Sequence, residues 1–455
     1  METRELLEQQ VMDAVLELLA QKDYRQLRSL SEELQPADLA ELLEDMEQSQ
    51  RLLVFRLLKK EVAAEAFSYM DAEERGELVE ALSDAKLTEV LEEMALDDAA
   101  DLLEEMPASV VKRVLGRSSK ETRDMLNQLL HYPEDSAGSI MNAEYVRLGK
   151  DLTVEEAFAV IRRVGENAET VYTCYVVERN RLIGVVTARD LMLANPDDLV
   201  TDLMDENIIS VNVTDDKEFV ANEMNRYGFM AMPVVDSEGM LVGIVTLDDA
   251  TDVLIEEATE DIQGMAAIHP SEDSYFATSV FAHARNRIPW LLVLMLSATF
   301  TGMILNHYES AFAAVPLLVS FIPMLMDTGG NCGNQSSVLM VRGLALGEIE
   351  PRDALRVAFK ELRVALIVGS VLAVVNDLRV FIMYKDYRLA VLIAISLLLA
   401  IIIAKLIGCT LPLAVQRIGL DPALMASPFI TTIVDACSIT IYFGIATQMF
   451  HLAGV

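Results

Sequence analysis

The chain has 455 residues, of which 71 are Asp or Glu and 36 are Lys or Arg, so its formal net charge is −35. Its length predicts several domains, and its acidity argues against nucleic acid as a partner and for divalent cations. The four cysteines and five histidines show no metal-ligand spacing, so the sequence suggests no zinc, iron–sulfur or disulfide framework. Residues 287–455 carry 11 Lys/Arg and 10 Asp/Glu, so the acidity resides in residues 1–286.

Residues 1–131 carry apolar side chains at three- and four-residue spacing, which predicts helices throughout. A weak repeat joins AELLEDM at 40–46, GELVEAL at 76–82 and ADLLEEM at 100–106. Stacked helical hairpins that form an acidic superhelical domain are the architecture this pattern favours. The N-terminus, METRELLEQQ, has neither the basic segment nor the cleavage site of a signal peptide, so we expect this domain in the cytoplasm.

Residues 132–250 contain a duplicated unit. VVERNRLIGVVTARD and VVDSEGMLVGIVTLDD each predict strand, turn, strand and helix start, and an amphipathic helix precedes each. This pattern resembles a tandem pair of α/β CBS modules, which we place at 132–200 and 201–250. In that family the Thr and Asp of GxxTxxD can hold the ribose of an adenine nucleotide, although many pairs serve only in dimerisation and sensing. The resemblance marks four residues for ATP: Thr187, Asp190, Thr246 and Asp249.

The second module continues into LDDATDVLIEEATEDIQGM, residues 247–265, which predicts a helix with seven acidic side chains and no basic one. Spacings of three and four residues place several carboxylates on one face, where they repel each other. Cations or a basic neighbour at that face would relieve the repulsion, while a solvated linker helix is the alternative. We assign residues 251–284 to a connecting helix and linker that controls the apolar region after it.

Residues 285–455 form the predicted membrane domain, with five spans near 288–306, 313–341, 364–384, 390–415 and 424–450. Eight basic residues fall on the side of the N-terminal domain and three on the opposite side, in agreement with the positive-inside rule. The N-terminus is therefore expected inside and the C-terminus outside. Lys405 falls within the fourth span, and we expect its ammonium to extend toward the inner surface.

The second span includes TGGNCGNQSS, an unusual composition for a helix that faces lipid. Glycines permit close helix packing or local unwinding, and amide side chains in hydrocarbon are costly unless they line water or another helix. One interpretation is a small-residue packing interface. The other, which we favour, is a polar permeation path that includes Gly330, Asn331, Gly333 and Asn334.

The last span, SPFITTIVDACSITIYFGIATQM at 427–449, carries a full charge at Asp435. A carboxylate at membrane depth costs at least ~2.5 kcal/mol, so a site that faces a pore or partner is the default interpretation. A protonated Asp bonded to a neighbouring helix is the alternative. Thr431 and Thr432 lie close by in the sequence, and such oxygen-bearing side chains suit hard cations such as Mg²⁺.

Taken together, TGGNCGNQSS with VRGLALGEI and DPALMASPFITTIVDACSITIYF closely resemble the MgtE family of bacterial magnesium channels. YPEDSAGSIM, RIPWLL and EEATEDI match the same family in the same order. The resemblance implies a homodimer of five-span subunits in the bacterial cell membrane, with a pore on the two-fold axis and the pore carboxylate at Asp435. The chain departs from the family pattern at Ser427, commonly Asn, at Cys332, and at Asp327, a second carboxylate that many members lack.

The acidic region suggests how such a channel is gated. Acidic faces separate when cytoplasmic Mg²⁺ is scarce and close when cations bridge them. Two unit charges ~8 Å apart in water repel by only ~0.5 kcal/mol, whereas moving a gate from mostly open to mostly closed takes ~5.5 kcal/mol, so several weak sites must act together. The alternatives are a channel that also passes Mn²⁺, Co²⁺ or Ca²⁺, or a membrane-anchored Mg²⁺ sensor without transport; an enzyme is not expected. The candidate sensor residues are Asp97, Asp98, Asp101, Asp248, Asp249, Asp252, Glu256, Glu257 and Glu260.

Overall fold

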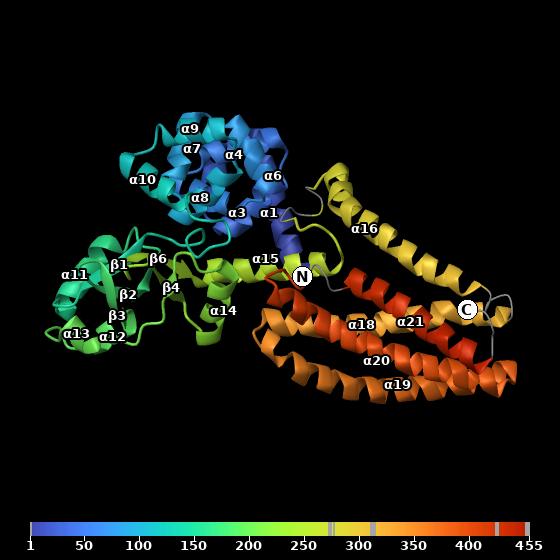
Figure 1. Cartoon of the computed structure of the whole chain (residues 1–455). Coiled ribbons are helices and arrows are strands. Elements are labelled where there is room, and N and C mark those ends of the chain that lie inside the picture. Colours follow the sequence, from blue (N-terminus) through green and yellow to red (C-terminus); the bar gives the residue numbers. More distant parts are fainter. Residues whose placement is uncertain (1, 272–274, 276–277, 310–314, 424–426, 451–455) are drawn as a thin grey trace. The chain divides into compact units, whose positions relative to one another are not determined.

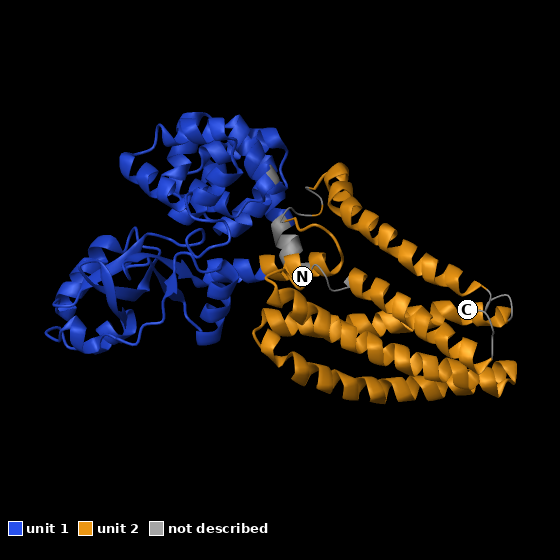
Figure 2. Cartoon of the chain, in the orientation of Figure 1, with its two compact units in different colours: residues 1–255 blue, residues 256–455 orange. Residues whose placement is uncertain are grey.

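The computed structural model describes residues 2–271, 275, 278–309, 315–423 and 427–450. These residues divide into two compact units, residues 1–255 and residues 256–455 (Figure 2). The first unit combines helices with two small sheets, and the second consists of helices (Figure 1). The predicted helix at 247–265 is present as α15 (Leu247–Met265), and the division between the units falls within it.

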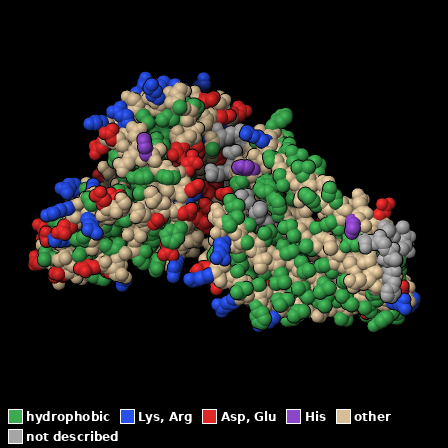
Figure 3. All heavy atoms as spheres, in the orientation of Figure 1, with side chains coloured by type: hydrophobic (Ala, Val, Ile, Leu, Met, Phe, Trp, Pro, Cys, Tyr) green, Lys and Arg blue, Asp and Glu red, His purple; other side chains and the backbone are tan. Residues whose placement is uncertain are grey.

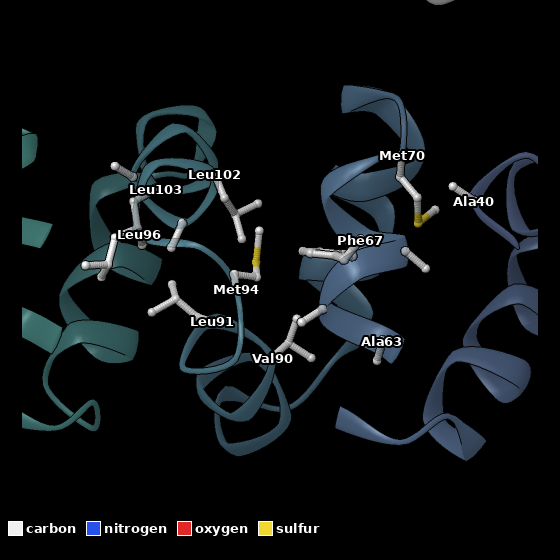
Figure 4. Close-up of a cluster of buried hydrophobic side chains, with 14 of the residues drawn as sticks. Ala40, Ala63, Phe67, Met70, Val90, Leu91, Met94, Leu96, Leu102 and Leu103 are labelled. Atoms are coloured by element: carbon white, nitrogen blue, oxygen red, sulfur yellow. The ribbon is translucent and has the colours of Figure 1, made fainter. Parts of the chain in front are cut away.

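Short helices make up the first 130 residues, as the periodicity predicted. Alternate helices pack on one another, so that α3, α5, α7 and α9 form one row and α2, α4 and α6 form another. Side chains such as Phe67, Met94 and Leu102 fill the space between neighbouring helices (Figure 4). The helices are α1 (Glu2–Gln21), α2 (Tyr24–Ser31), α3 (Pro36–Glu44), α4 (Gln48–Leu57), α5 (Lys60–Ser68), α6 (Ala72–Ala81), α7 (Asp84–Leu91), α8 (Leu96–Glu105), α9 (Ala108–Leu115) and α10 (Lys120–Leu129).

The duplicated unit forms two three-stranded sheets with the same topology. In each sheet the middle strand pairs in parallel with the strand before it and antiparallel with the strand after it. The first module contains β1 (Tyr145–Gly149), α11 (Val154–Val164), β2 (Thr170–Glu178), β3 (Arg181–Thr187), α12 (Ala188–Leu193) and α13 (Val200–Leu203). The second contains β4 (Val211–Asn212), α14 (Lys217–Tyr227), β5 (Ala231–Val235) and β6 (Leu241–Thr246), followed by α15.

The two modules exchange the segments that precede them. Asn142 bridges to Ile244 in β6, and Asp205 bridges to Val185 in β3. The glycine of each GxxT motif makes room for this crossing, because a Cβ at Gly184 would overlap the Met204 sulfur and one at Gly243 would lie 2.6 Å from the sulfur of Met141. The paired modules therefore form one intertwined body.

The second unit contains five long helices among its described residues: α16 (Val280–His307), α18 (Ile322–Ala345), α19 (Ala354–Tyr384), α20 (Tyr387–Arg417) and α21 (Ser427–Met449). Two short 3₁₀ turns, η1 (Pro316–Phe321) and η2 (Pro351–Asp353), precede α18 and α19. Four of the long helices are long and apolar enough to cross a membrane; α18 does not reach that hydropathy. The predicted span starts at 313 and 424 fall outside the described residues.

Two helices begin earlier than the hydropathy indicated. The first starts at Val280 rather than 288, where Ser279 Oγ accepts a hydrogen bond from the Ala282 amide. The third starts at Ala354 rather than 364, because the basic but helix-favouring stretch ALRVAFKELR continues the helix beyond its apolar part. Hydropathy detects the apolar part of a helix and not its polar end.

α18 lies against α20 and α21, while α19 packs along α20 and α16 along α21. The visible surface of this unit is mainly hydrophobic, whereas charged side chains gather on the first unit (Figure 3). α18 approaches α20 so closely that a Cβ at Gly408 would overlap the carbonyl oxygen of Gly333. The buried face of α18 is thus a small-residue surface that permits backbone contact.

We expect Gly408→Ala to destabilise this helix contact. The added methyl group meets rigid backbone, so the cost should be about 1–3 kcal/mol, seen as a lower melting temperature of the purified protein. Gly444→Ala is the matched control, because a Cβ there meets no atom within 4 Å and the exchange should be neutral or stabilising. Equal melting temperatures for the two variants would contradict the close contact.

Candidate metal-ion sites

Six of the predicted sensor residues come together in the first unit. Asp97, Asp98 and Asp101 lie on α8, and Asp248, Asp249 and Asp252 lie on the first two turns of α15. The mutual repulsion of Asp97 with Asp249 and of Asp98 with Asp248 and Asp252 joins the two groups into one acidic cluster. Acidic side chains also gather on the visible face of this unit (Figure 3).

Two further residues complete this acidic cluster. The Asn142 side-chain amide donates to Asp97 Oδ1 and to Glu169 Oε2, both at 3.1 Å. Asn142 is fully buried and Asp97 is 8% exposed. Nothing in the sequence distinguishes Glu169 from a surface acid or Asn142 from a loop residue, so neither was predicted.

Arg75 offsets part of the mutual repulsion of the cluster, because it lowers the pKa values of Asp98 and Asp101, but their pKa values remain raised. Burial, together with Asp249 and Asp98, raises the pKa of Asp97 well above its usual range, and burial raises the pKa of Asp98. Burial and neighbouring carboxylates raise the pKa of Asp101 and of Glu169 to about 7. The pKa of Asp249 rises to about 6 through burial, although its hydrogen bond from Thr246 opposes the rise. A cluster of this kind favours the binding of protons or cations.

The cluster does not resemble a tight, directly ligated site. Within the described residues, no three His, Cys, Asp or Glu side chains are arranged to hold a metal ion. Separated carboxylates with raised pKa values suit a cation that keeps much of its water, as Mg²⁺ does. The donor chemistry therefore fits Mg²⁺ as a weakly bound, partly hydrated ion.

The remaining sensor candidates, Glu256, Glu257 and Glu260, lie on the part of α15 that belongs to the second unit. There the end of α15 meets the helical bundle: Met265 packs against Val341 and Ala423. Burial and the nearby Asp421 raise the pKa of Asp261 to about 6. This contact, which spacing alone could not predict, connects α15 to α18 and to the loop before α21.

Asp435 is half-buried on α21, and its Oδ1 atom is buried without a hydrogen-bond partner among the described residues. Asp327 on α18 is close enough to repel it electrostatically. The Oδ1 of Asn334 and the hydroxyl groups of Ser337 and Ser438 are likewise buried without a partner in the part of the chain that the structure describes. Such unsatisfied oxygen atoms require water, an ion or another chain.

The other predicted pore residues divide into packing and polar positions. A Cβ at Gly330 would lie 3.2 Å from the Thr431 side chain, and one at Gly333 would lie 2.8 Å from Ile430, so both glycines contact α21. Thr432 donates its hydroxyl to the Pro428 carbonyl. Asn331 is exposed on the surface of the bundle. The glycines thus occupy positions of helix packing, as a small-residue interface would require. The amide side chains remain available to line a polar permeation path.

The prediction that Lys405 extends toward the surface was wrong. It is 4% exposed, its ammonium donates to Ser336 Oγ at 3.1 Å, and it lies 3.6 Å from Glu361 Oε2. A buried carboxylate partner on α19 removes the need to reach water.

The two GxxTxxD motifs have the same local geometry but different surroundings. Thr187 and Asp190 form a reciprocal cap at the start of α12, and Thr246 donates to Asp249 at the start of α15. The first pair is exposed, whereas Asp249 lies in the acidic cluster. An anionic nucleotide is therefore better accommodated at the first pair.

The raised pKa values predict a pH-dependent stability. Because these pKa values exceed those of the unfolded chain, the protonated carboxyl groups favour the folded state. Their contribution to the free energy of unfolding is complete below about pH 4 and is lost as the pH rises to about 7. Without divalent cations, the melting temperature should fall over this range, and that of Asp101→Asn should fall less than that of wild type. Asp197→Asn, at an exposed position outside the acidic cluster, is the control. An equal pH slope for wild type and Asp101→Asn would refute this interpretation.

Apolar helices with a half-buried carboxylate, joined to paired α/β modules and an acidic helical domain, are the arrangement expected of a membrane transporter for cations. Three family models match: the MgtE divalent cation transporter at 322–445, the MgtE intracellular N domain at 34–135, and the CBS domain at 137–197 and 200–256. The chain belongs to the MgtE family, which confirms the resemblance seen in its motifs.

The similarity to named members is nearly full-length. The magnesium transporter MgtE of Thermus thermophilus is 39% identical over 98% of this chain and 100% of that protein. That of Bacillus subtilis is 34% identical over 96% of this chain and 97% of that protein. Both are named transporters, in agreement with the expectation that the chain is not an enzyme.

Two solved structures are similar to about half of the chain. The cytosolic domain of the Mg²⁺ channel MgtE in complex with ATP is 40% identical, with a TM-score of 0.51, and covers 53% of this chain and 99% of that one. The soluble part of a magnesium transporter is 32% identical, with a TM-score of 0.53, over 55% of this chain and 99% of that one.

Proposed function

We propose that the chain is a Mg²⁺-selective channel for magnesium uptake that cytoplasmic Mg²⁺ closes. The observation that carries this proposal is the buried, unpartnered carboxylate oxygen of Asp435 among the described residues, on a helix that packs against polar α18. The names of the relatives support magnesium as the transported ion. A membrane carboxylate that lacks a partner among the described residues is expected to face an ion path.

The proposed pore lies on the two-fold axis of a homodimer. One Asp435 from each subunit supplies two negative charges, which match the charge of Mg²⁺. Because Mg²⁺ gives up its water reluctantly, the path should address a hydrated ion, with Asn331, Asn334, Thr431 and Thr432 accepting hydrogen bonds from its waters. Cavity size and the rigidity of this shell would then set selectivity. Asp327 would stand next in line along the same path.

Gating follows from the acidic cluster. At low cytoplasmic Mg²⁺, repulsion between α8 and the start of α15 favours their separation. A divalent cation supplies the positive charge that lets these faces close. α15 then transmits the change, because its end packs on Val341 and Ala423 at the inner end of the bundle. Several weakly held carboxylates, rather than one tight site, supply the required energy.

The topology and the domain limits follow the same proposal. We place the chain in the bacterial cell membrane as a multi-pass protein, with five spanning helices, the N-terminal superhelical domain in the cytoplasm and the C-terminus outside. α18 is the span that hydropathy alone does not identify. Its polar side chains lower its hydropathy and suit the wall of a pore.

We also propose that ATP binds the first CBS module at Thr187 and Asp190. The ATP complex of a similar cytosolic domain supports a nucleotide site. The exposed position of this pair, away from the repulsion that surrounds Asp249, supports its choice.

Flux measurements decide between this function and its alternatives. Purified wild-type protein in liposomes should carry Mg²⁺ when internal Mg²⁺ is low and stop when it reaches millimolar levels. Comparable flux of Mn²⁺, Co²⁺ or Ca²⁺ would favour the broader divalent channel. No flux under either condition, with Mg²⁺ still protecting the cytosolic unit from proteolysis, would favour a membrane-anchored sensor.

A further inference from the structure

Three polar side chains from three helices meet inside the membrane unit. Ser336 on α18 donates its hydroxyl to Glu361 Oε2 on α19 at 2.7 Å, and Lys405 on α20 donates to Ser336 Oγ at 3.1 Å. The Lys405 ammonium is 3.6 Å from Glu361 Oε2. The exposed fractions are 0% for Ser336, 7% for Glu361 and 4% for Lys405.

This triad lies well inside the helical bundle. Lys405 is 12 residues from Arg417, where α20 ends, and Glu361 is seven residues from Ala354, where α19 begins, so the two charges lie about 18 Å and about 10 Å along their helices from these ends. Burying charged groups at such a depth costs free energy. Buried charges in proteins generally line an ion pathway or help to define one particular packing of the helices. Here the two charges offset each other, and a single hydroxyl from α18 forms a hydrogen bond with each of them.

The triad is adjacent to the contacts that hold α18. Gly333 and Gly408, each three residues from a member of the triad, form the backbone contact between α18 and α20. The glycine contacts bring the two backbones together, but they add no side-chain hydrogen bond that would fix the rotation and height of α18. Charge-assisted hydrogen bonds are directional and define both.

The same helix presents the amides of the proposed path. Among the described residues, Asn334, two positions before Ser336, has an unpartnered buried oxygen, and Ser337 has an unpartnered buried hydroxyl. A change in the rotation of α18 at Ser336 would displace both of these groups. Loss of one charge alone would also leave a net charge beside a cation path.

We propose that Ser336, Glu361 and Lys405 form a charge-neutral clamp that positions α18 for cation selectivity. The clamp rests on the proposed channel function. Glu361 and Lys405 are positioning residues, because they act through the placement of Asn334 and its neighbours rather than on the ion.

The test compares Mg²⁺ and Na⁺ flux into liposomes for protein that elutes as a single folded species from size-exclusion chromatography. Glu361→Gln and Lys405→Gln should each lower the Mg²⁺/Na⁺ flux ratio about tenfold or more, because each leaves an uncompensated buried charge. The exchanged pair, Glu361→Lys with Lys405→Glu, should recover much of the ratio. Ser336→Ala keeps both charges and should lower the ratio through the loss of the link to α18.

The matched control is Ser396→Ala. Ser396 is as buried as Ser336, but its hydroxyl donates to Leu392 within its own helix, so the ratio should not change. If Glu361→Gln and Lys405→Gln fail to fold, Ser336→Ala and the exchanged pair still test the clamp. Wild-type flux ratios in Ser336→Ala and in the folded charge variants would overturn it. If wild type and Ser396→Ala both fail to carry Mg²⁺, the channel function fails instead.

Discussion

Asp435→Ala should reduce Mg²⁺ flux to the level of empty liposomes while the protein remains folded. The side chain has a buried oxygen with no partner among the described residues, so little structure depends on it. In the proposed dimer, this variant would remove the two negative charges that offset the cost of an ion inside the membrane. Uptake followed with a Mg²⁺-sensitive dye inside the liposomes measures the loss directly.

The control for this variant is Asp386→Asn, which removes one negative charge from the same unit. Asp386 caps the start of α20 by accepting hydrogen bonds from the Arg388 and Leu389 amides. The Asp386→Asn protein should have a slightly lower melting temperature and an unchanged Mg²⁺ flux. If Asp435→Ala conducts like wild type, the pore carboxylate lies elsewhere, and Asp327→Asn becomes the decisive variant.

Periodicity carried most of the fold prediction. The duplicated strand–turn–strand pattern, with its glycines 59 residues apart, predicted both sheets, because each repeat buries the same kind of surface. Residues 247–265 form the predicted helix despite their seven acidic side chains. Helix starts were less accurate, since those at Val280 and Ala354 lie outside the apolar windows that define a span.

The site predictions were limited by contacts between distant residues. Asp97 and Asp249 were recognised by their charge, but Asn142 and Glu169 join them only because the CBS modules fold back on α8. Lys405 was expected near the surface because its partner, Glu361, lies 44 positions away on another helix. No local pattern reports such a pairing.

Neutralising the acidic cluster should remove the closure by cytoplasmic Mg²⁺. In the double variant Asp98→Asn with Asp249→Asn, both sides of the α8–α15 contact lose a carboxylate. The facing helices then repel less without Mg²⁺ and gain less from it. We expect the internal Mg²⁺ concentration that halves flux to rise at least about tenfold, which corresponds to about 1.4 kcal/mol of lost coupling.

The control carries the same charge change at exposed positions outside the cluster, Glu166→Gln with Asp197→Asn. Because surface charges contribute little individually, its Mg²⁺ dependence should match that of wild type. The two double variants have equal net charge, so a difference between them reports the position of the carboxylates and not the overall acidity of the chain. If both double variants shift the Mg²⁺ dependence equally, Mg²⁺ is sensed by the total negative charge of the acidic region and not by the cluster. If neither shifts it, closure depends on carboxylates of the second unit, with Asp261 and Asp421 the first to exchange.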